Sequence, residues 1–165
     1  MYCRSKILLL QRDLMFKLRG RLKLLISKDA YDKLINCPKV PPEIGGILMG
    51  TDSKIDTVIL DKGIKKNDDT GIKYIPNVRN LNKWISILNK QGKEFLGIFH
   101  THAHQWATLS NADISYIERI MNAMSDEMRC LYFPIVYPGE KVKSYKAQKK
   151  DLQIIIENEE IKLVD

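Results

Sequence analysis

The sequence predicts an α/β domain in which a mixed β-sheet is flanked by α-helices. Short apolar runs of strand length alternate with longer segments whose apolar residues recur at helical spacing, and turn residues separate them. The length of 165 residues is enough for one domain with a proper core and too short for two comfortable ones. We therefore predict one domain over residues 21–165, preceded by an N-terminal extension over residues 1–20 that fits this pattern poorly.

The first half of the domain is predicted to contain three strands and one helix. Ser27 precedes the helical segment as an N-cap, and a proline-rich stretch ends it. The Gly45–Gly46 pair weakens the strand that contains it, which indicates either a plain bend or the close approach of another backbone or a ligand. The elements expected here are a strand at 22–26, a helix from 28 to about 36, and strands at 44–49 and 56–60.

The second half begins with a turn-rich loop at 62–73, which predicts a mobile connection. The next helix starts at Asn77 or Asn80, and its apolar stripe at helical spacing includes Trp84 as a core residue. Pro134 lies inside an apolar strand and places that strand at an edge or a bulge. The elements expected are a helix ending near 90, a strand from 95 towards 102, a helix from 111 to about 125, and strands at 130–137, 142–147 and 152–156.

Composition limits the class of partner. Lys and Arg exceed Asp and Glu by 27 to 20, a formal net charge of +7 that could suit nucleic acid, an anionic membrane or an acidic protein. The positive residues are scattered along the chain, which argues against nucleic acid. No apolar run of 18 residues occurs, which excludes a membrane-spanning helix. The three cysteines are odd in number and include no Cys-x-x-Cys pair, which favours a reducing cytoplasm.

The three histidines of the chain fall in one short stretch, at His100, His102 and His104. If the apolar run from Phe95 continues as a strand to His102, His100 and His102 lie on the same face of that strand. Two neighbouring imidazoles at a strand end can begin a zinc site, although an isolated His-x-His pair is more often surface or core histidine. His104 is interpreted as an exposed loop residue, and Trp106 as core or as part of a substrate channel.

Ser110 and Asp113 follow this stretch and precede isoleucines at helical spacing. Ser110 is therefore predicted to be a helix N-cap with Asp113 in the first turn, a pattern that on its own is usually a capping box. A carboxylate in that turn can also point back towards the strand end and supply a third metal ligand. Three protein ligands and one open position describe a catalytic zinc, whereas a structural zinc has four. The two motifs in this order and at this spacing are improbable by chance.

These residues resemble those of a known family. His100-Thr-His102, then seven residues, Ser110, two residues and Asp113 match the JAMM (MPN-plus) metalloprotease motif at every defining position. Ala103 stands where many members have proline, a departure that removes no ligand but leaves the loop less rigid.

An upstream glutamate completes the family's motif. The segment from Glu43 to Gly50 is similar to the Glu-x-Gly-Gly-x-Leu-x-Gly strand that carries it. The resemblance covers about residues 21 to 150 in element order. It implies that the catalytic domain at 21–165 has the cytidine-deaminase-like (JAB/MPN) form of the mixed sheet flanked by helices.

The resemblance implies zinc as the cofactor and a role for each matched residue. His100, His102 and Asp113 would bind the metal, leaving water as the fourth ligand, and zinc lowers the pKa of such a water to about 7. Glu43 would act as general base towards that water and then as general acid towards the leaving amine. Ser110 would donate a hydrogen bond to the oxyanion formed during amide hydrolysis.

The preferred function is a zinc peptidase or isopeptidase that cleaves after the C-terminal tail of a ubiquitin-like modifier, in deconjugation or precursor processing. A general zinc peptidase and a non-catalytic scaffold of the same fold are the alternatives, although such scaffolds typically lack the ligands. A nucleoside deaminase needs a His-x-Glu with Pro-Cys-x-x-Cys pattern that the sequence lacks. The short single domain resembles bacterial members of anti-phage or sulfur-carrier pathways. The modifier, the type of bond, an activating partner and the oligomeric state stay open.

Overall fold

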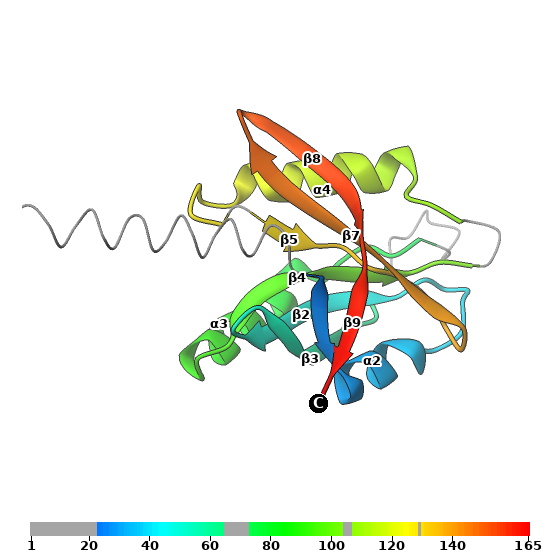
Figure 1. The fold of residues 1–165 in the computed structure, drawn as a ribbon. Helices are drawn as coiled ribbons and strands as arrows, with labels where there is room; N and C mark the ends of the chain where they lie inside the picture. Colours follow the sequence, from blue (N-terminus) through cyan, green and yellow to red (C-terminus); the bar gives the residue numbers. More distant parts are fainter. Residues whose placement is uncertain (1–22, 65–72, 104–106, 129) are drawn as a thin grey trace, which may run out of the picture.

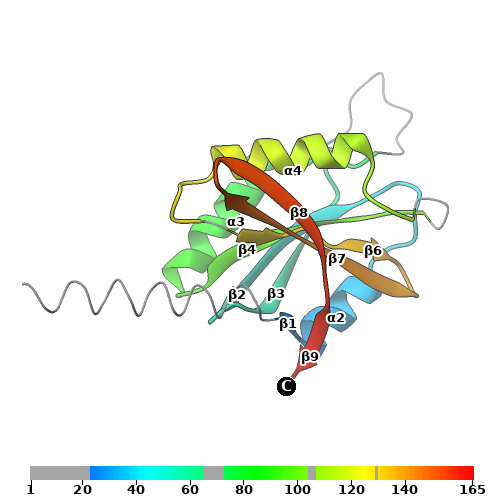
Figure 2. The ribbon, with the colours of Figure 1, turned by 45° about the horizontal axis from the view of Figure 1, so that its top comes forward.

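The structure, a computed structural model, describes residues 23–64, 73–103, 107–128 and 130–165. Its strands form one mixed sheet in the order β5-β7-β6-β4-β2-β3-β1-β9, with β8 paired to β7 (Figures 1 and 2). The strands are β1 Leu24–Ser27, β2 Gly45–Thr51, β3 Lys54–Asp61, β4 Glu94–Thr101, β5 Cys130–Tyr132, β6 Ile135–Tyr137, β7 Lys141–Lys150, β8 Gln153–Glu159 and β9 Ile161–Val164. The helices are α2 Lys28–Ile35, α3 Val78–Lys90 and α4 Asn111–Ala123. The predicted mixed α/β fold is confirmed.

Some sequence-based expectations concern other parts of the chain. The N-terminal extension at 1–20, most of the loop at 62–73, His104 and Trp106 lie outside the described residues.

The two faces of the sheet are covered by different helices. Helix α2 lies on one face, and α3 and α4 lie on the other (Figures 1 and 2). Leu48 and Phe99 pack in the buried cluster that includes α2, whereas Ile47 packs in the cluster that includes α3 and α4. Neighbouring residues of a strand point to opposite faces. His100, the residue after Phe99, is therefore expected to point to the face on which α4 lies.

The helices begin at polar side chains that accept hydrogen bonds from their first turns. Ala30 N donates to Ser27 Oγ at 3.2 Å, and Asn80 N donates to Asn77 Oδ1 at 3.2 Å. The N-cap of α3 is thus Asn77, the first of the two predicted starts. Ser110 caps α4 in a capping box, as predicted. Among the described residues, no helix combines the length and the apolar character needed to span a membrane.

The expectation that Trp84 belongs to the core is wrong. Its exposed fraction is 39%, because α3 contacts the sheet through Leu81 and Leu88 and turns Trp84 towards solvent. The single strand expected at 130–137 is two strands, β5 and β6, separated at Pro134. Both lie between β4 and β7 inside the sheet and not at an edge. Proline has no N–H to give to a ladder, so the strand pairing is interrupted there. Strand β9 was not predicted.

The Gly45–Gly46 pair marks close backbone approach, one of the two readings of the sequence. A Cβ atom on Gly46 would lie 1.9 Å from the carbonyl oxygen of Ile59 in β3. A Cβ atom on Gly45 would lie 2.6 Å from the carbonyl oxygen of Phe99 in β4. Glycine thus lets β2 fit between its two neighbours in the sheet.

We expect Gly46→Ala to lower the free energy of unfolding by about 1–3 kcal/mol, because backbone must move to admit the methyl group. Thermal denaturation should show a Tm lower by several degrees. Asn82→Ala on the exposed side of α3 is the control and should stay within about 0.5 kcal/mol of the wild type. Equal Tm values for Gly46→Ala and the wild type would contradict the expectation.

Candidate metal centre

The end of β4 positions two imidazoles. His100 N donates to Pro134 O at 3.3 Å, and His102 N donates to Val136 O at 2.9 Å. These bonds attach the end of β4 and the residue after it to β6 and its preceding loop. His100 and His102 are two residues apart on this extended stretch, so both side chains lie on one face. The prediction that the two imidazoles lie on the same face is confirmed, since their Nε2 atoms are 2.8 Å apart.

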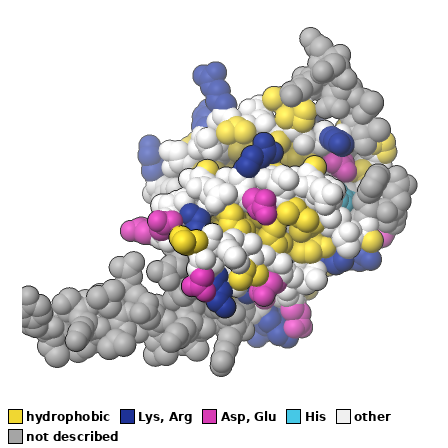
Figure 3. Space-filling model, turned by 90° about the horizontal axis from the view of Figure 1, so that it is seen from above, with side chains coloured by type: hydrophobic (Ala, Val, Ile, Leu, Met, Phe, Trp, Pro, Cys, Tyr) yellow, Lys and Arg dark blue, Asp and Glu magenta, His cyan; other side chains and the backbone are white. Residues whose placement is uncertain are grey.

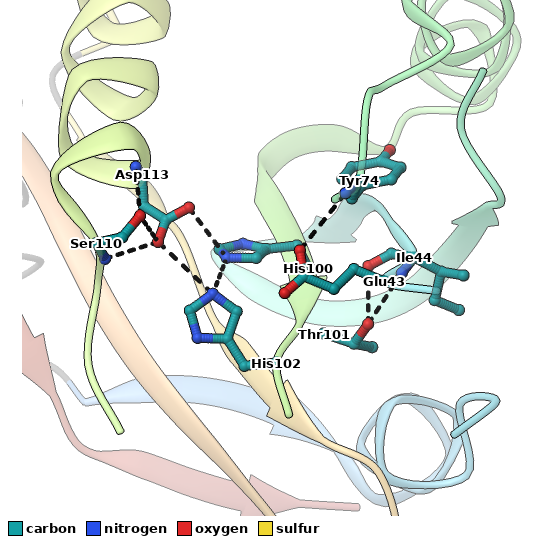
Figure 4. A network of polar contacts seen from close by, with 8 residues as sticks. All are labelled: Glu43, Ile44, Tyr74, His100, Thr101, His102, Ser110 and Asp113. Carbon is teal, nitrogen blue, oxygen red and sulfur yellow. Dashed lines mark hydrogen bonds and ion pairs between the residues drawn. The ribbon is translucent and has the colours of Figure 1, made fainter. Parts of the chain in front are cut away.

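The first turn of α4 supplies a carboxylate to the same place. Ser110 N and Ser110 Oγ both donate to Asp113 Oδ2, at 2.7 Å and 2.8 Å, and Asp113 N donates back to Ser110 Oγ at 3.2 Å. These bonds hold the Asp113 side chain beside the start of its own helix. Figure 4 shows the carboxylate directed from there towards both imidazoles.

In consequence, one imidazole nitrogen of each histidine and both carboxylate oxygens of Asp113 converge. His100 Nε2 lies 2.8 Å from His102 Nε2. Asp113 Oδ1 lies 3.3 Å from His100 Nε2, and Asp113 Oδ2 lies 3.6 Å from His102 Nε2. One ligand atom from each of the three residues can be chosen so that all lie within 4.8 Å of one another. Among the described residues, His100, His102 and Asp113 are the set that could hold a metal ion in this way.

This geometry fits a zinc ion. Tetrahedral zinc with bonds of about 2.0–2.1 Å to nitrogen or oxygen separates two ligand atoms by about 3.3 Å. The two imidazole nitrogens are 2.8 Å apart, Asp113 Oδ1 lies 3.3 Å from His100 Nε2 and Asp113 Oδ2 lies 3.6 Å from His102 Nε2, all close to that value. The side chains of His100 and Asp113 are 17% and 20% exposed, so one side of the group is open to solvent. Figure 3 shows a small area of histidine surface on the face seen from above.

The pKa of Asp113 is set by opposing effects. Burial alone raises the pKa, but hydrogen bonds from His100 and His102, the charge of His100 and the backbone N–H of Ser110 together hold it well below its ordinary value. The carboxyl group is therefore ionised at neutral pH, which is the state that binds a metal.

Glu43 precedes β2, and the pairing of β2 with β4 sets its position. Ile44 N donates to Thr101 Oγ1 at 2.9 Å, and Thr101 N donates to Ile44 O at 2.8 Å. These bonds place the start of β2 beside the end of β4. Their partner on β4, Thr101, lies between the two histidines in the sequence. Tyr74 N donates to Glu43 Oε2 at 3.4 Å. In Figure 4 the Glu43 carboxylate is directed towards His100.

The hydroxyl group of Ser110 has partners within α4. It donates to Asp113 Oδ2 and accepts from Asp113 N. Donation to a substrate oxyanion, the role predicted for Ser110, therefore requires the hydroxyl hydrogen to turn away from the carboxylate. The structure places Ser110 beside the three converging residues in Figure 4.

The described cysteines do not offer an alternative nucleophile. Burial raises the pKa of the Cys37 thiol to about 11, against a small opposing effect of Lys33. Burial also raises the pKa of Cys130 to about 11. A thiol with such a pKa is protonated at neutral pH and reacts poorly. Neither of the two described cysteines is therefore activated as a thiolate nucleophile.

Sequence reasoning did not find three residues that support the site. Thr101 was passed over although strand alternation turns it inwards, where its hydroxyl group bonds β2. Asp61 and Tyr74 were also missed. Their side chains meet through the hydrogen bond from Tyr74 Oη to Asp61 Oδ2 at 2.8 Å. No local pattern marks a contact between residues on opposite sides of a long loop.

Comparison with known proteins gives a fold. No family model matches the sequence, and no curated protein matches it. A protein from Desulfitobacterium hafniense, with a structure determined in solution, has a TM-score of 0.57 and 20% identity over 86% of this chain and 92% of that chain. A protein from Salinibacter ruber has a TM-score of 0.52 and 17% identity over 86% and 92%. A JAB1/MPN domain protein from Archaeoglobus fulgidus has a TM-score of 0.49 and 17% identity over 86% and 99%. This chain shares its fold with the first two.

Proposed function

We propose that this protein is a zinc-dependent peptidase or isopeptidase of the JAMM type. Its proposed reaction is hydrolysis of the bond after the C-terminal tail of a ubiquitin-like modifier. The observation that carries the proposal is the convergence of His100, His102 and Asp113 at the end of β4, with Glu43 directed towards them. Two imidazoles and a carboxylate with one side open match a catalytic zinc site.

The proposal divides the chemistry among named groups. His100, His102 and Asp113 hold the zinc, which when bound supplies a water of low pKa and a Lewis acid for the scissile carbonyl. Glu43 accepts the proton of the attacking water and returns it to the leaving nitrogen. Ser110 donates its hydroxyl hydrogen to the developing oxyanion.

A non-catalytic scaffold would need none of this arrangement. Hydrogen bonds from Ser110 fix the Asp113 carboxylate beside two imidazoles, and the Glu43 side chain approaches from the segment that precedes β2. A scaffold has no use for two imidazoles and two carboxylates directed towards one place, because removing these polar groups from water costs free energy. The arrangement therefore supports an enzyme over a scaffold.

The way in which a modifier tail binds needs one correction to the sequence reasoning. From the sequence alone, the segment 44–49 and the loop 103–109 are expected to be short edge elements that hold an extended modifier tail by strand addition. The structure places β2 inside the sheet, paired with β3 on one side and β4 on the other, so its backbone groups are used. A bound tail must use another surface near Glu43. The loop 103–109, the other expected contact, lies partly outside the described residues.

We expect cleavage directly after a terminal glycine of the modifier. A small side chain at that position lets the scissile carbonyl reach the converging ligands, and replacing the glycine by leucine or tryptophan should lower kcat/KM by at least about a hundredfold. A ubiquitin-like protein fused to a reporter, with glycine, leucine or tryptophan at its end, provides the measurement. Equal cleavage of the three fusions, or of unrelated unfolded protein, would leave a general peptidase.

The cellular setting belongs to the same proposal. We place the enzyme in the cytoplasm, acting on a ubiquitin-like protein or its conjugate in an anti-phage or sulfur-carrier pathway. The neighbouring genes test this setting: genes for a ubiquitin-like protein with E1-like and E2-like enzymes would support deconjugation, and their absence would count against it.

A further inference from the structure

Asp61 is a buried acid that the proposed reaction does not use. It ends β3, and only 6% of its surface is exposed. Its Oδ2 atom accepts two hydrogen bonds of 2.8 Å, one from Tyr74 Oη and one from Asn77 N. Both donors lie beyond the loop that follows β3. These two bonds satisfy the buried oxygen and tie the end of β3 to the segment that leads into α3.

Tyr74, one of the two residues that donate to Asp61, lies directly against the start of β2. A Cβ atom on Gly45 would lie only 2.3 Å from Tyr74 Cε1, so the ring occupies the space that a side chain there would take. The backbone N–H of the same residue donates to Glu43 Oε2 at 3.4 Å. Burial, then the hydrogen bond to Asp61 and its negative charge, raise the pKa of Tyr74. Its hydroxyl group therefore stays protonated and remains a donor.

The two ends of the loop are joined close to this contact. Ile64 N donates to Ile75 O at 2.9 Å. Asn77, which gives its N–H to Asp61, is also the N-cap of α3. The position of the Tyr74 backbone is thus fixed from both sides, and its N–H has a defined direction relative to Glu43.

We propose that Asp61 and Tyr74 are positioning residues for the Glu43 carboxylate. Asp61 holds the Tyr74 hydroxyl group, the ring rests on Gly45, and the Tyr74 N–H binds Glu43 Oε2. One carboxylate oxygen is thereby held, and the other is left to accept a proton. This inference rests on the proposed function for its effect on rate, but the contact itself can be tested without turnover.

The kinetic test uses Tyr74→Phe, which removes only the hydroxyl group, and Asp61→Asn, which keeps the shape of the side chain. Each should lower kcat by about 10- to 100-fold with KM and zinc content unchanged. In a Glu43→Gln background, Tyr74→Phe should cause no further loss, because its effect passes through Glu43. The matched control is Tyr145→Phe, since the buried Tyr145 hydroxyl makes no hydrogen bond within the described residues. Its kcat should equal that of the wild type.

A structural readout tests the contact between Tyr74 and Glu43 separately from the proposed peptidase function. The backbone amide resonance of residue 74 should shift in Glu43→Gln and in Asp61→Asn, and should stay in place in Tyr145→Phe. If the wild-type protein shows no turnover but the residue 74 amide resonance shifts in these two variants, the proposed function is overturned and the positioning contact is supported. An unmoved resonance would overturn the inference, as would a wild-type kcat in Tyr74→Phe or an equal loss in the Glu43→Gln background.

Discussion

Replacing Glu43 with glutamine is expected to lower kcat by at least about a hundredfold while the protein still binds about one zinc per chain. Glutamine keeps the size of the side chain and can still accept the hydrogen bond from Tyr74 N, but it cannot take up the proton of the attacking water. Turnover of a ubiquitin-like fusion and metal analysis of the same sample give the two measurements. The control is Glu118→Gln on the exposed side of α4, which should leave both unchanged.

The three possible results have different meanings. A large loss of kcat with zinc retained separates the general base from the metal ligands and supports the proposed mechanism. Loss of zinc together with activity would show that Glu43 maintains the structure of the site. Normal turnover would mean that another acid accepts the proton.

The fold was predictable to the extent that local signals decide it. The N-caps at Ser27 and Ser110 and the prolines mark helix boundaries because capping and breaking act within one turn. The exposure of Trp84 was not predictable, because helical spacing gives a stripe without saying which of its members the sheet reaches. The inner positions of β2 and of the two strands on either side of Pro134 depend on strand pairing between distant residues.

In the site, too, the features set by sequence spacing were predictable and the contacts between distant residues were not. His100 and His102 share a strand, so their common face follows from spacing, and Asp113 follows from the cap at Ser110. Their convergence required β4 and α4 to meet, which the family resemblance implied and periodicity alone did not. Asp61 and Tyr74 contact each other across a loop, so only coordinates show that the acid reaches the residue that binds Glu43.

Removing any one of the three converging ligands is expected to abolish turnover and to weaken zinc binding by more than about a hundredfold. That is a larger loss than the 10- to 100-fold typical of residues that only support a ligand. His100→Ala and His102→Ala test the imidazoles. Asp113→Ala also breaks the capping box and so costs about 0.5–2 kcal/mol of stability. The sharper variant is Asp113→Asn, whose amide oxygen can still accept from Ser110 N but carries no charge.

Metal analysis after dialysis and thermal denaturation distinguish a ligand from a structural residue. Asp113→Asn should lose zinc, and its metal-free form should lose less Tm than Asp113→Ala, because the amide oxygen can still accept from Ser110 N although the charge stabilised by His100 and His102 is gone. Asp113→Ala should lose both zinc and several degrees of Tm. Full zinc content in the triple variant of His100, His102 and Asp113 would show that the metal binds elsewhere. In that case the convergence of these groups at the end of β4 would need another explanation.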